Sequence, residues 1–384
     1  MNPWHPRRKF QCRLLIAITV AITVSLSPCL DSVAEQPENE RAAASVTAPP
    51  VTALAMAPSG DRIVSGSQAG ISIYKWPSMA IVESHDFEIG QIQSLRFSPD
   101  ATRLLIAGGK PSEVGQWQIA TWPDLSIVAS SSEHDDVIHS AIWLSDDRFV
   151  TGAADTEVIQ WQMQSHADAS SRATIVRRLT GHSRRVLSVE SIDRGRLLIS
   201  AGVDQSLRVW SNDADLVTPL RVLDNHTGIV RDLARRPGDH PIAYLASASA
   251  DKTVRIWQPS IGRLVRFARL PVEPLCIAWS SDGNQIGVGC IDGKLRIVNA
   301  NTVTVEQTLP AVNGWAYSIL ATQDGSYIIG GTDGKLAHVK PIPPTNPLMQ
   351  NHQSTPATQG GRRAVIQPGL SLACPSGFCR DADH

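Results

Sequence analysis

The sequence predicts an all-β protein in which one short antiparallel unit is repeated seven times. Stretches of alternating apolar and polar residues are broken by turns rich in Gly, Asp and Pro, which is the pattern of short antiparallel strands. Similar units recur roughly every 40 to 50 residues, so the repeat, and not the total length, sets the domain organisation. Apolar residues make up 42% of the chain and charged residues 18%, which argues against disorder of the chain as a whole.

The charge balance bears on the class of partner. The chain has 35 Lys and Arg against 36 Asp and Glu, a formal net charge of -1. A protein dedicated to nucleic acid carries a basic surplus that neutralises phosphates. We therefore expect no nucleic-acid partner.

The N-terminus has the features of an export signal. Arg7, Arg8 and Lys9 precede an apolar run from Leu14 to Leu26. A run of about 13 residues is too short to span a bilayer, which needs about 20. Because small residues follow, we expect residues 1–34 to form a signal peptide that is cleaved after Ala34. The remainder is then expected outside the cytoplasm, in the periplasm, the envelope or the extracellular space.

Three variants of this signal stay open. Residues 26–29 distantly resemble a lipobox that would leave a lipidated Cys29, although Pro28 departs from that pattern. The pair Arg7-Arg8 resembles a twin-arginine signal, and the segment could also remain as an uncleaved anchor. All three keep the protein outside the cytoplasm. Membrane association is expected only through this segment, if it is uncleaved or lipidated.

Each repeat has the same order of elements. An alternating apolar strand is followed by a turn, then a second strand ending in small residues, a tight turn with Asp, and a third strand ending in Trp or Val. The first strands are expected to start near Val51, Ile92, Val137, Val186, Ile229, Pro274 and Trp315. The third strands are expected to end near Tyr74 or Trp76, and then at Trp117, Trp161, Trp210, Trp257, Val298 and Val339.

Three repeats share a His, then an Asp, then a Trp six residues after the Asp. These sets are His134, Asp155 and Trp161; His182, Asp204 and Trp210; and His226, Asp251 and Trp257. The pattern resembles the WD40 repeat family, in an exported, bacterial-type member with degenerate repeats. The resemblance implies a seven-bladed β-propeller of four-stranded antiparallel blades over residues 51–341.

The resemblance also implies a hydrogen-bonded tetrad of His, Ser or Thr, Asp and Trp inside a blade. The matching residues are His134, Ser140, Asp155 and Trp161 in blade three, His182, Ser188, Asp204 and Trp210 in blade four, and His226, Asp251 and Trp257 in blade five. In blade five Asp232 stands at the position matched to the hydroxyl residue, so the resemblance supplies no hydroxyl for that network.

A glycine-rich segment and two pairs of cysteines lead to further predictions. In blade two a longer glycine-rich loop, from Gly108 to Gly115, replaces the tight turn. Cys276 and Cys290 fall on neighbouring strands of blade six, where we expect buried small residues or, if their side chains face each other, a cross-strand disulfide. The pair Cys374 and Cys379 could close a small loop if oxidised.

The segments that flank the repeats have separate expected roles. Residues 35–50 form a linker in which about Arg41 to Thr47 could supply the outer strand of blade seven, as it often does in the family. The segment Pro347 to His352 is the rival, because it echoes part of blade five. Residues 342–384 are rich in Pro and Gln and are expected to be disordered.

The expected function is non-catalytic binding of a still unidentified protein by a monomeric scaffold. The sequence shows no nucleophile elbow and no Cys/His spacing typical of zinc, so we expect no enzyme activity, no cofactor and no metal. Aromatic and Arg side chains are enriched at interface hot spots. The expected partner-binding residues lie where inner strands begin, at the top rim of the propeller: Trp315, Arg184, Arg185, Asp136 and Glu273.

Two other functions stay open. The first is a propeller enzyme, of the metal-dependent hydrolase or lactonase type, with a site in the central channel. Such a site needs several inward-pointing acidic, His or Asn residues that converge at one end. The second is a structural component of the envelope that docks through the Pro-rich tail.

Overall fold

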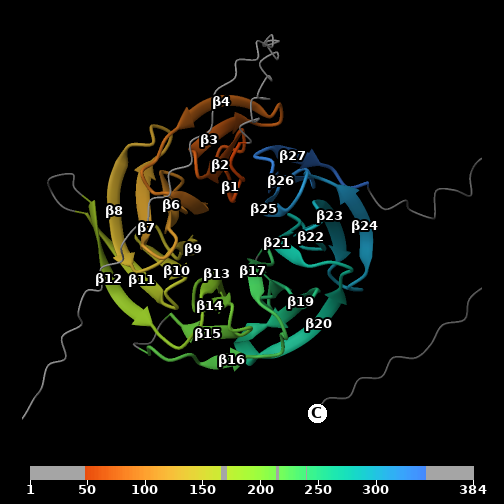
Figure 1. Cartoon of the computed structure of the whole chain (residues 1–384). Helices are drawn as coiled ribbons and strands as arrows, with labels where there is room; N and C mark the ends of the chain where they lie inside the picture. Colours follow the sequence, from red (N-terminus) through yellow and green to blue (C-terminus); the bar gives the residue numbers. More distant parts are fainter. Residues whose placement is uncertain (1–47, 166–170, 213–215, 239, 343–384) are drawn as a thin grey trace, which may run out of the picture. The chain divides into compact units, whose positions relative to one another are not determined.

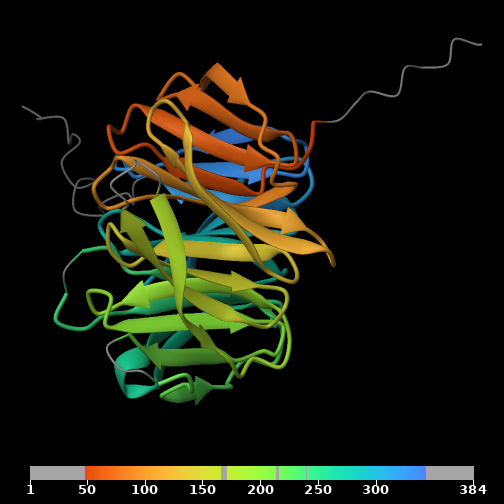
Figure 2. The ribbon, with the colours of Figure 1, turned by 90° about the vertical axis from the view of Figure 1, so that its left-hand side faces the viewer.

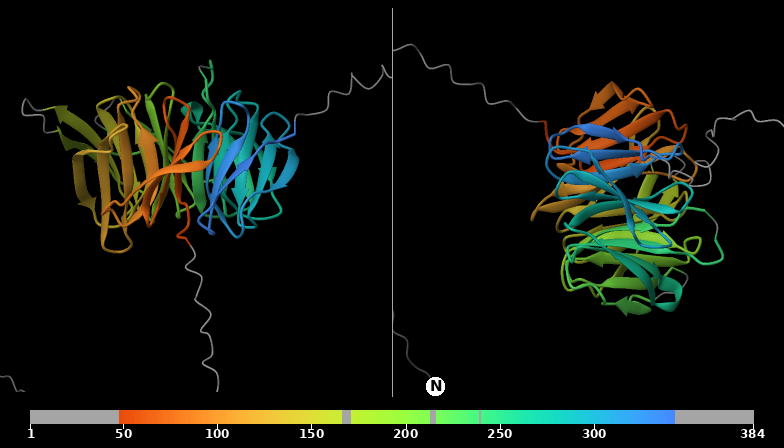
Figure 3. Two further views of the ribbon diagram at one scale, coloured as in Figure 1. Left: turned by 90° about the horizontal axis from the view of Figure 1, so that it is seen from above. Right: turned by 90° about the vertical axis from the view of Figure 1, so that its right-hand side faces the viewer.

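The computed structural model describes residues 48–165, 171–212, 216–238 and 240–342. These residues form seven antiparallel sheets arranged as blades around a central channel (Figure 1). Seen from the side, the strands of each blade run from one face of the ring to the other (Figures 2 and 3). The predicted seven-bladed, all-β propeller is therefore confirmed.

Each blade is built from consecutive strands that start at the channel and move outwards. The inner strands are β1 (Ala53–Met56), β5 (Gln91–Phe97), β9 (Ile138–Trp143), β13 (Val186–Ile192), β17 (Val230–Arg235), β21 (Pro274–Trp279) and β25 (Ala316–Ala321). The second strands are β2 (Arg62–Ser67), β6 (Arg103–Lys110), β10 (Arg148–Ala153), β14 (Leu197–Gly202), β18 (Leu245–Ser249), β22 (Gln285–Cys290) and β26 (Tyr327–Gly331).

The third and outer strands complete the blades. The third strands are β3 (Gly70–Lys75), β7 (Val114–Thr121), β11 (Val158–Ser165), β15 (Leu207–Ser211), β19 (Thr253–Gln258), β23 (Lys294–Asn299) and β27 (Leu336–Val339). The outer strands are β4 (Ala80–His85), β8 (Ile127–His134), β12 (Ser171–Leu179), β16 (Arg221–Leu223), β20 (Arg263–Arg269) and β24 (Val305–Pro310). One short 3-10 helix, η1 (Pro259–Ile261), links β19 to β20.

Six blades have four strands, and blade seven has three within the described residues. Both candidates for its outer strand, about Arg41 to Thr47 and Pro347 to His352, lie outside the described residues, so that choice stays a prediction. After β27 the chain reaches blade six, where the backbone N–H of Ile342 donates to the Gln307 amide oxygen (2.9 Å).

Blade one closes the ring against blade seven through Val51. The backbone N–H of Val51 donates to the carbonyl of Gly331 (3.1 Å), and the Ser318 hydroxyl donates to the carbonyl of Val51 (3.0 Å). The Val51 side chain is buried in one apolar cluster with Ile63 of blade one and Ile328 of blade seven. Closure in this way protects sheet edges that would otherwise pair with other chains.

The core lies between neighbouring blades. Trp117 of blade two packs edge-on against Phe149 and Trp161 of blade three, with ring centroids 4.9 and 5.1 Å apart. All three side chains are almost fully buried. A single four-stranded sheet cannot bury both of its faces, so each blade depends on its neighbours for a core.

The glycine-rich segment of blade two is not a loop. Strands β6 and β7 pair continuously from Arg103 and Thr121 to Lys110 and Val114, which leaves residues 111–113 as the turn. A Cβ atom on Gly108 would lie 2.0 Å from the carbonyl oxygen of Gln91 in β5. The glycines therefore allow a close approach of neighbouring strands, and the prediction of a long loop at Gly108 to Gly115 is wrong.

Among the residues that the structure describes, no helix has the length and apolar character that a membrane span requires.

Candidate protein-interaction site

The three tetrads are present, but with different hydroxyl residues from those predicted. In blade four, His182 Nδ1 lies 2.8 Å from Asp204, and His182 Nε2 lies 2.7 Å from the hydroxyl of Ser200, which also accepts the Trp210 indole N–H (2.8 Å). Thr151 takes this role in blade three, and Ser247 takes it in blade five. The prediction of Ser140 and Ser188 is wrong, and blade five has a complete network after all.

The order of donors and acceptors in a tetrad follows from the Trp. Because the indole N–H only donates, the hydroxyl oxygen accepts it and directs its own hydrogen to His Nε2. His Nδ1 then carries the ring proton and donates to the Asp. Burial opposes ionisation of Asp251, but hydrogen bonds from Thr253 and His226 outweigh it and lower the pKa of this carboxyl to about 2. Burial lowers the pKa of His226, so this ring stays neutral.

Ser140 and Ser188 instead join neighbouring blades. The Ser140 oxygen accepts the backbone N–H of Val189 in blade four (3.1 Å), and the Ser188 oxygen accepts that of Leu233 in blade five (3.1 Å). Six blades have a polar side chain at this inner-strand position, each bonded to the next blade's backbone. We call this set the interblade belt: Ser94, Ser140, Ser188, Asp232, Cys276 and Ser318.

Blade six replaces the tetrad by an ion pair. Asp292 lies in the tight turn between β22 and β23, and both terminal nitrogens of Arg296 bond to its carboxylate (2.9 and 2.7 Å). The Arg296 side chain is nearly buried in the blade. A bidentate pair of this kind fixes the turn without a His.

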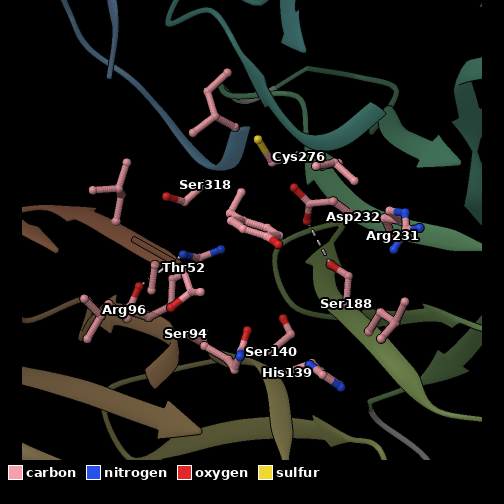
Figure 4. A pocket seen from close by; sticks show the side chains of 18 residues that line it. Thr52, Ser94, Arg96, His139, Ser140, Ser188, Arg231, Asp232, Cys276 and Ser318 are labelled. Atoms are coloured by element: carbon pink, nitrogen blue, oxygen red, sulfur yellow. Dashed lines mark hydrogen bonds between the residues drawn. The ribbon is translucent and has the colours of Figure 1, made fainter. Parts of the chain in front are cut away.

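A cavity of about 310 Å³ lies in the central channel (Figure 4). Its wall is made by inner strands of all seven blades, including the belt residues and the residues just before them. Among the residues just before the belt positions, His139, Arg231 and Tyr317 have titratable or cationic side chains. They were not among the site residues predicted from the sequence. The regular spacing of the repeats could have located them, because each stands one residue before a belt position.

Asp232 is the belt carboxylate, and its hydrogen bonds span three blades. Its oxygens accept the backbone N–H groups of Ile277 (2.9 Å) and Leu233 (2.8 Å) and the Ser188 hydroxyl (3.2 Å). Burial raises the pKa of Asp232 to about 6, although Ile277 and the nearby Arg96 favour the ionised form. These contacts give the carboxylate a role in joining blades.

Cys276 and Cys290 are buried and free, with no disulfide between them. Cys276 stands opposite Gly289 across β21 and β22, not opposite Cys290. The expectation of small buried residues is confirmed, and the cross-strand disulfide is not formed.

Both thiols are expected to resist alkylation by iodoacetamide in the native protein and to react in urea. Burial raises the pKa of Cys290 to about 11 and holds the pKa of Cys276 well above its usual value, so little thiolate is present at neutral pH. Peptide mapping after labelling measures the reaction at each site. Labelling of Cys276 in native protein as fast as in urea would contradict the burial of this thiol.

Within residues 48–165, 171–212, 216–238 and 240–342, no three or more His, Cys, Asp or Glu side chains come together in a way that could hold a metal ion.

The predicted partner-binding residues all lie at one face of the ring. We call the face at which the inner strands begin the top face, and the opposite one the bottom face. Trp315 is 51% exposed, and its ring lies edge-on to Tyr317 with centroids 5.8 Å apart. Arg184 and Arg185 are exposed just before β13. The prediction that these three residues form a partner surface remains a prediction.

The carboxylates of Asp136 and Glu273 both make contacts with other parts of the protein. Asp136 accepts the backbone N–H groups of Ser112 and Val137 (2.8 Å each), so it holds the blade-two hairpin against blade three. Glu273 pairs with Arg231 of the neighbouring blade (2.7 Å). These two acids shape the rim around the channel mouth.

Comparison with known proteins places the repeats in a family. A family model described as WD domain, G-beta repeat matches residues 173–211, 217–258 and 271–299. The WD repeat-containing protein srw1 of Schizosaccharomyces pombe is 22% identical over 264 residues, which are 67% of this chain and 45% of the relative. Protein HIR1 of Mycosarcoma maydis is 27% identical over 226 residues, 52% of this chain and 22% of the relative.

A plant relative matches a shorter part. THO complex subunit 3 of Arabidopsis thaliana is 31% identical over 125 residues, 32% of this chain and 39% of the relative. The chain thus spans less than half the length of each of these three relatives. Because all three are eukaryotic, they do not confirm the bacterial type. The matched segments, the tetrads and the closed seven-bladed ring together show that the chain carries WD40 repeats.

Proposed function

We propose that this propeller is a non-catalytic platform that binds another protein through its top face. The top-face surface is Trp315, Arg184 and Arg185, with Asp136 and Glu273 as supporting residues of the rim. A rigid ring of blades holds loops from separate repeats in fixed positions, so one face offers a broad contact area.

The exposed indole of Trp315 is the observation that carries this proposal. Half of this large side chain is open to solvent, while Tyr317 holds its ring from the channel side. Its backbone N–H donates to the Thr332 hydroxyl (2.9 Å), which fixes the loop before β25. A fixed, exposed aromatic residue loses little conformational entropy when it binds, which is why Trp is enriched at hot spots.

The names of two relatives support a protein partner. THO complex subunit 3 and, from Dictyostelium discoideum, anaphase-promoting complex subunit cdc20 are named as subunits of complexes. The alternative of an enzyme would need free acidic groups in the channel. Asp232 is not a free acidic group, because both of its carboxylate oxygens already accept backbone N–H groups of the blades.

The proposed place of action is outside the cytoplasm. This part of the proposal rests on the basic and apolar pattern of residues 1–34, which lie outside the described residues. The monomeric state and the disordered tail are likewise predictions from the sequence. N-terminal sequencing of the mature protein tests the export signal, and sedimentation tests the oligomeric state.

The double variant Trp315→Ala, Arg185→Glu is expected to lose its partner in a pull-down from an envelope fraction of the source cells. The control is Ile81→Ala, which removes a similarly exposed apolar side chain (63%) from the outer strand β4. Mass spectrometry compares the captured proteins with those of the wild type. Equal capture by both variants would exclude the top-face surface, and no enrichment by the wild type would count against a protein-binding function.

A further inference from the structure

The inner strands of six blades each carry a β-bulge beside the central channel. At each bulge one residue has no partner on the second strand, because the register shifts there by one residue. A bulge changes the direction of a side chain relative to the regular alternation of the strand. Each of these residues stands just before the belt position of its blade and lines the channel cavity. We call this set the channel ring: Gln93, His139, Leu187, Arg231, Leu275 and Tyr317.

Three side chains of the channel ring have unused hydrogen-bonding groups. Within the part of the chain that the structure describes, no hydrogen bond joins the side chain of Gln93, His139 or Tyr317 to another residue. Burial and the nearby Arg185 lower the pKa of His139 to about 4, and burial raises the pKa of the Tyr317 phenol. At neutral pH the cavity therefore offers an amide, a neutral imidazole and a phenol, all three of which can both donate and accept.

The charged groups at the cavity balance one another. Nε and one terminal nitrogen of Arg231 bond to the Glu273 carboxylate (2.7 and 2.5 Å). Arg96 and Asp232 lie on different sides of the cavity (Figure 4), and the charge of Arg96 favours the ionised form of Asp232. Two arginines are thus matched by two carboxylates. The cavity has no net charge that would attract an ion of either sign, and this favours a neutral ligand.

Tyr317 also gives the cavity an aromatic surface. Its ring lies edge-on to the ring of Trp315, with centroids 5.8 Å apart. The face of an aromatic ring is apolar and carries a partial negative charge, so it packs well against C–H groups. Leu187 and Leu275 add apolar contact area. The cavity therefore combines neutral hydrogen-bonding groups with apolar surface, and a sugar ring presents both hydroxyl groups and C–H faces.

We propose that the channel cavity binds one neutral sugar of monosaccharide size. The side chains of Gln93, His139 and Tyr317 bond to its hydroxyl groups, and the Tyr317 ring packs against its C–H groups. A volume of about 310 Å³ lies at the lower end of the range for small-ligand pockets, about 300 to 1,000 Å³. We expect binding without turnover, because the Asp232 oxygens already accept backbone N–H groups. The site is separate from the top-face surface, so either proposal can fail without the other.

The test uses the full chain and saturation-transfer difference NMR, which detects weakly bound small molecules. The neutral probes are D-glucose, D-galactose and N-acetyl-D-glucosamine. The charged probes of similar size are D-gluconate and D-glucosamine. At least one neutral probe is expected to bind, and to bind more tightly than both charged probes.

A double variant, Gln93→Leu with Tyr317→Phe, removes two of the proposed hydrogen-bonding groups and nearly keeps the size of both side chains. It is expected to raise the dissociation constant of the bound probe about fivefold or more. Neither group bonds to the described part of the protein, so the variant is expected to fold, which circular dichroism checks. The matched control is Gln164→Leu at an exposed position of β11. Its dissociation constant is expected to stay within about twofold of the wild type.

Three results would overturn the proposal. They are binding of none of the neutral probes, tighter binding of a charged probe than of every neutral one, and wild-type affinity of the double variant for the bound probe. Equal weakening by Gln164→Leu would also contradict a site in the channel. Preference for a neutral probe that is weakened in the double variant and kept in Gln164→Leu supports it.

Discussion

Replacement of Ser200 by Ala is expected to lower the free energy of unfolding by about 2 to 5 kcal/mol. The hydroxyl of Ser200 serves two buried groups, the Trp210 indole N–H and Nε2 of His182. Each buried polar group left without a partner costs about 1 to 3 kcal/mol. Because Ser200 and Trp210 are fully buried, water cannot replace the lost hydroxyl without opening the blade.

The matched control is Ser200→Thr, which keeps the oxygen. Blade three already has a threonine at the equivalent position. The Thr151 hydroxyl oxygen accepts the Trp161 indole N–H (2.9 Å) and lies 2.8 Å from His134 Nε2. Urea unfolding followed by tryptophan fluorescence compares the two variants with the wild type. If Ser200→Ala were no less stable than Ser200→Thr, the hydroxyl would have no central role in the tetrad.

Replacement of Asp232 by Ser is expected to stabilise the protein relative to the wild type as the pH rises from 4.5 to 8. Burial raises the pKa of Asp232 to about 6 in the folded protein, against 3.8 as its ordinary value. The folded state therefore holds this proton more tightly than the unfolded state, and stability is lost as the pH rises through about 6. Two pKa units correspond to at most about 3 kcal/mol, of which partial exposure leaves about 1 to 2.

A serine fits this position because the belt uses it in the neighbouring blades. The oxygens of Ser140 and Ser188 accept a backbone N–H of the next blade at 3.1 Å, as Asp232 does from Ile277 at 2.9 Å. The control is Ser140→Ala, which removes a belt hydrogen bond but no titrating group. Its difference from the wild type should not change with pH. A pH-independent difference for Asp232→Ser would show that this carboxyl does not titrate with a raised pKa.

The sequence predicted the repeat accurately because the repeat is a local property. Each inner strand starts within two residues of its expected position, from β1 after Val51 to β25 after Trp315. Alternating apolar residues and Asp or Gly turns are set by the backbone of a single blade. The His, Asp and Trp of three tetrads followed from the same regular spacing.

The sequence did not predict which hydroxyl faces which neighbour. Ser188 and Ser200 lie on adjacent strands of one blade, and both are small, polar and buried. Only the folded structure shows that Ser200 of β14 accepts from Trp210 of β15, while Ser188 of β13 accepts from Leu233 of the next blade. In blade two, the glycines looked like a loop because their partners across the sheet were not visible from the sequence.

The amino-acid sequence by itself determined the number of blades, the order of their strands and the His, Asp and Trp of three networks, because these depend on contacts within about forty residues. The tertiary structure decided the interblade belt and the buried state of both thiols. Both arise only when separate blades pack against each other. The bond from the Ser318 hydroxyl to the carbonyl of Val51 shows this most directly, since it joins blade seven to blade one, from opposite ends of the repeats.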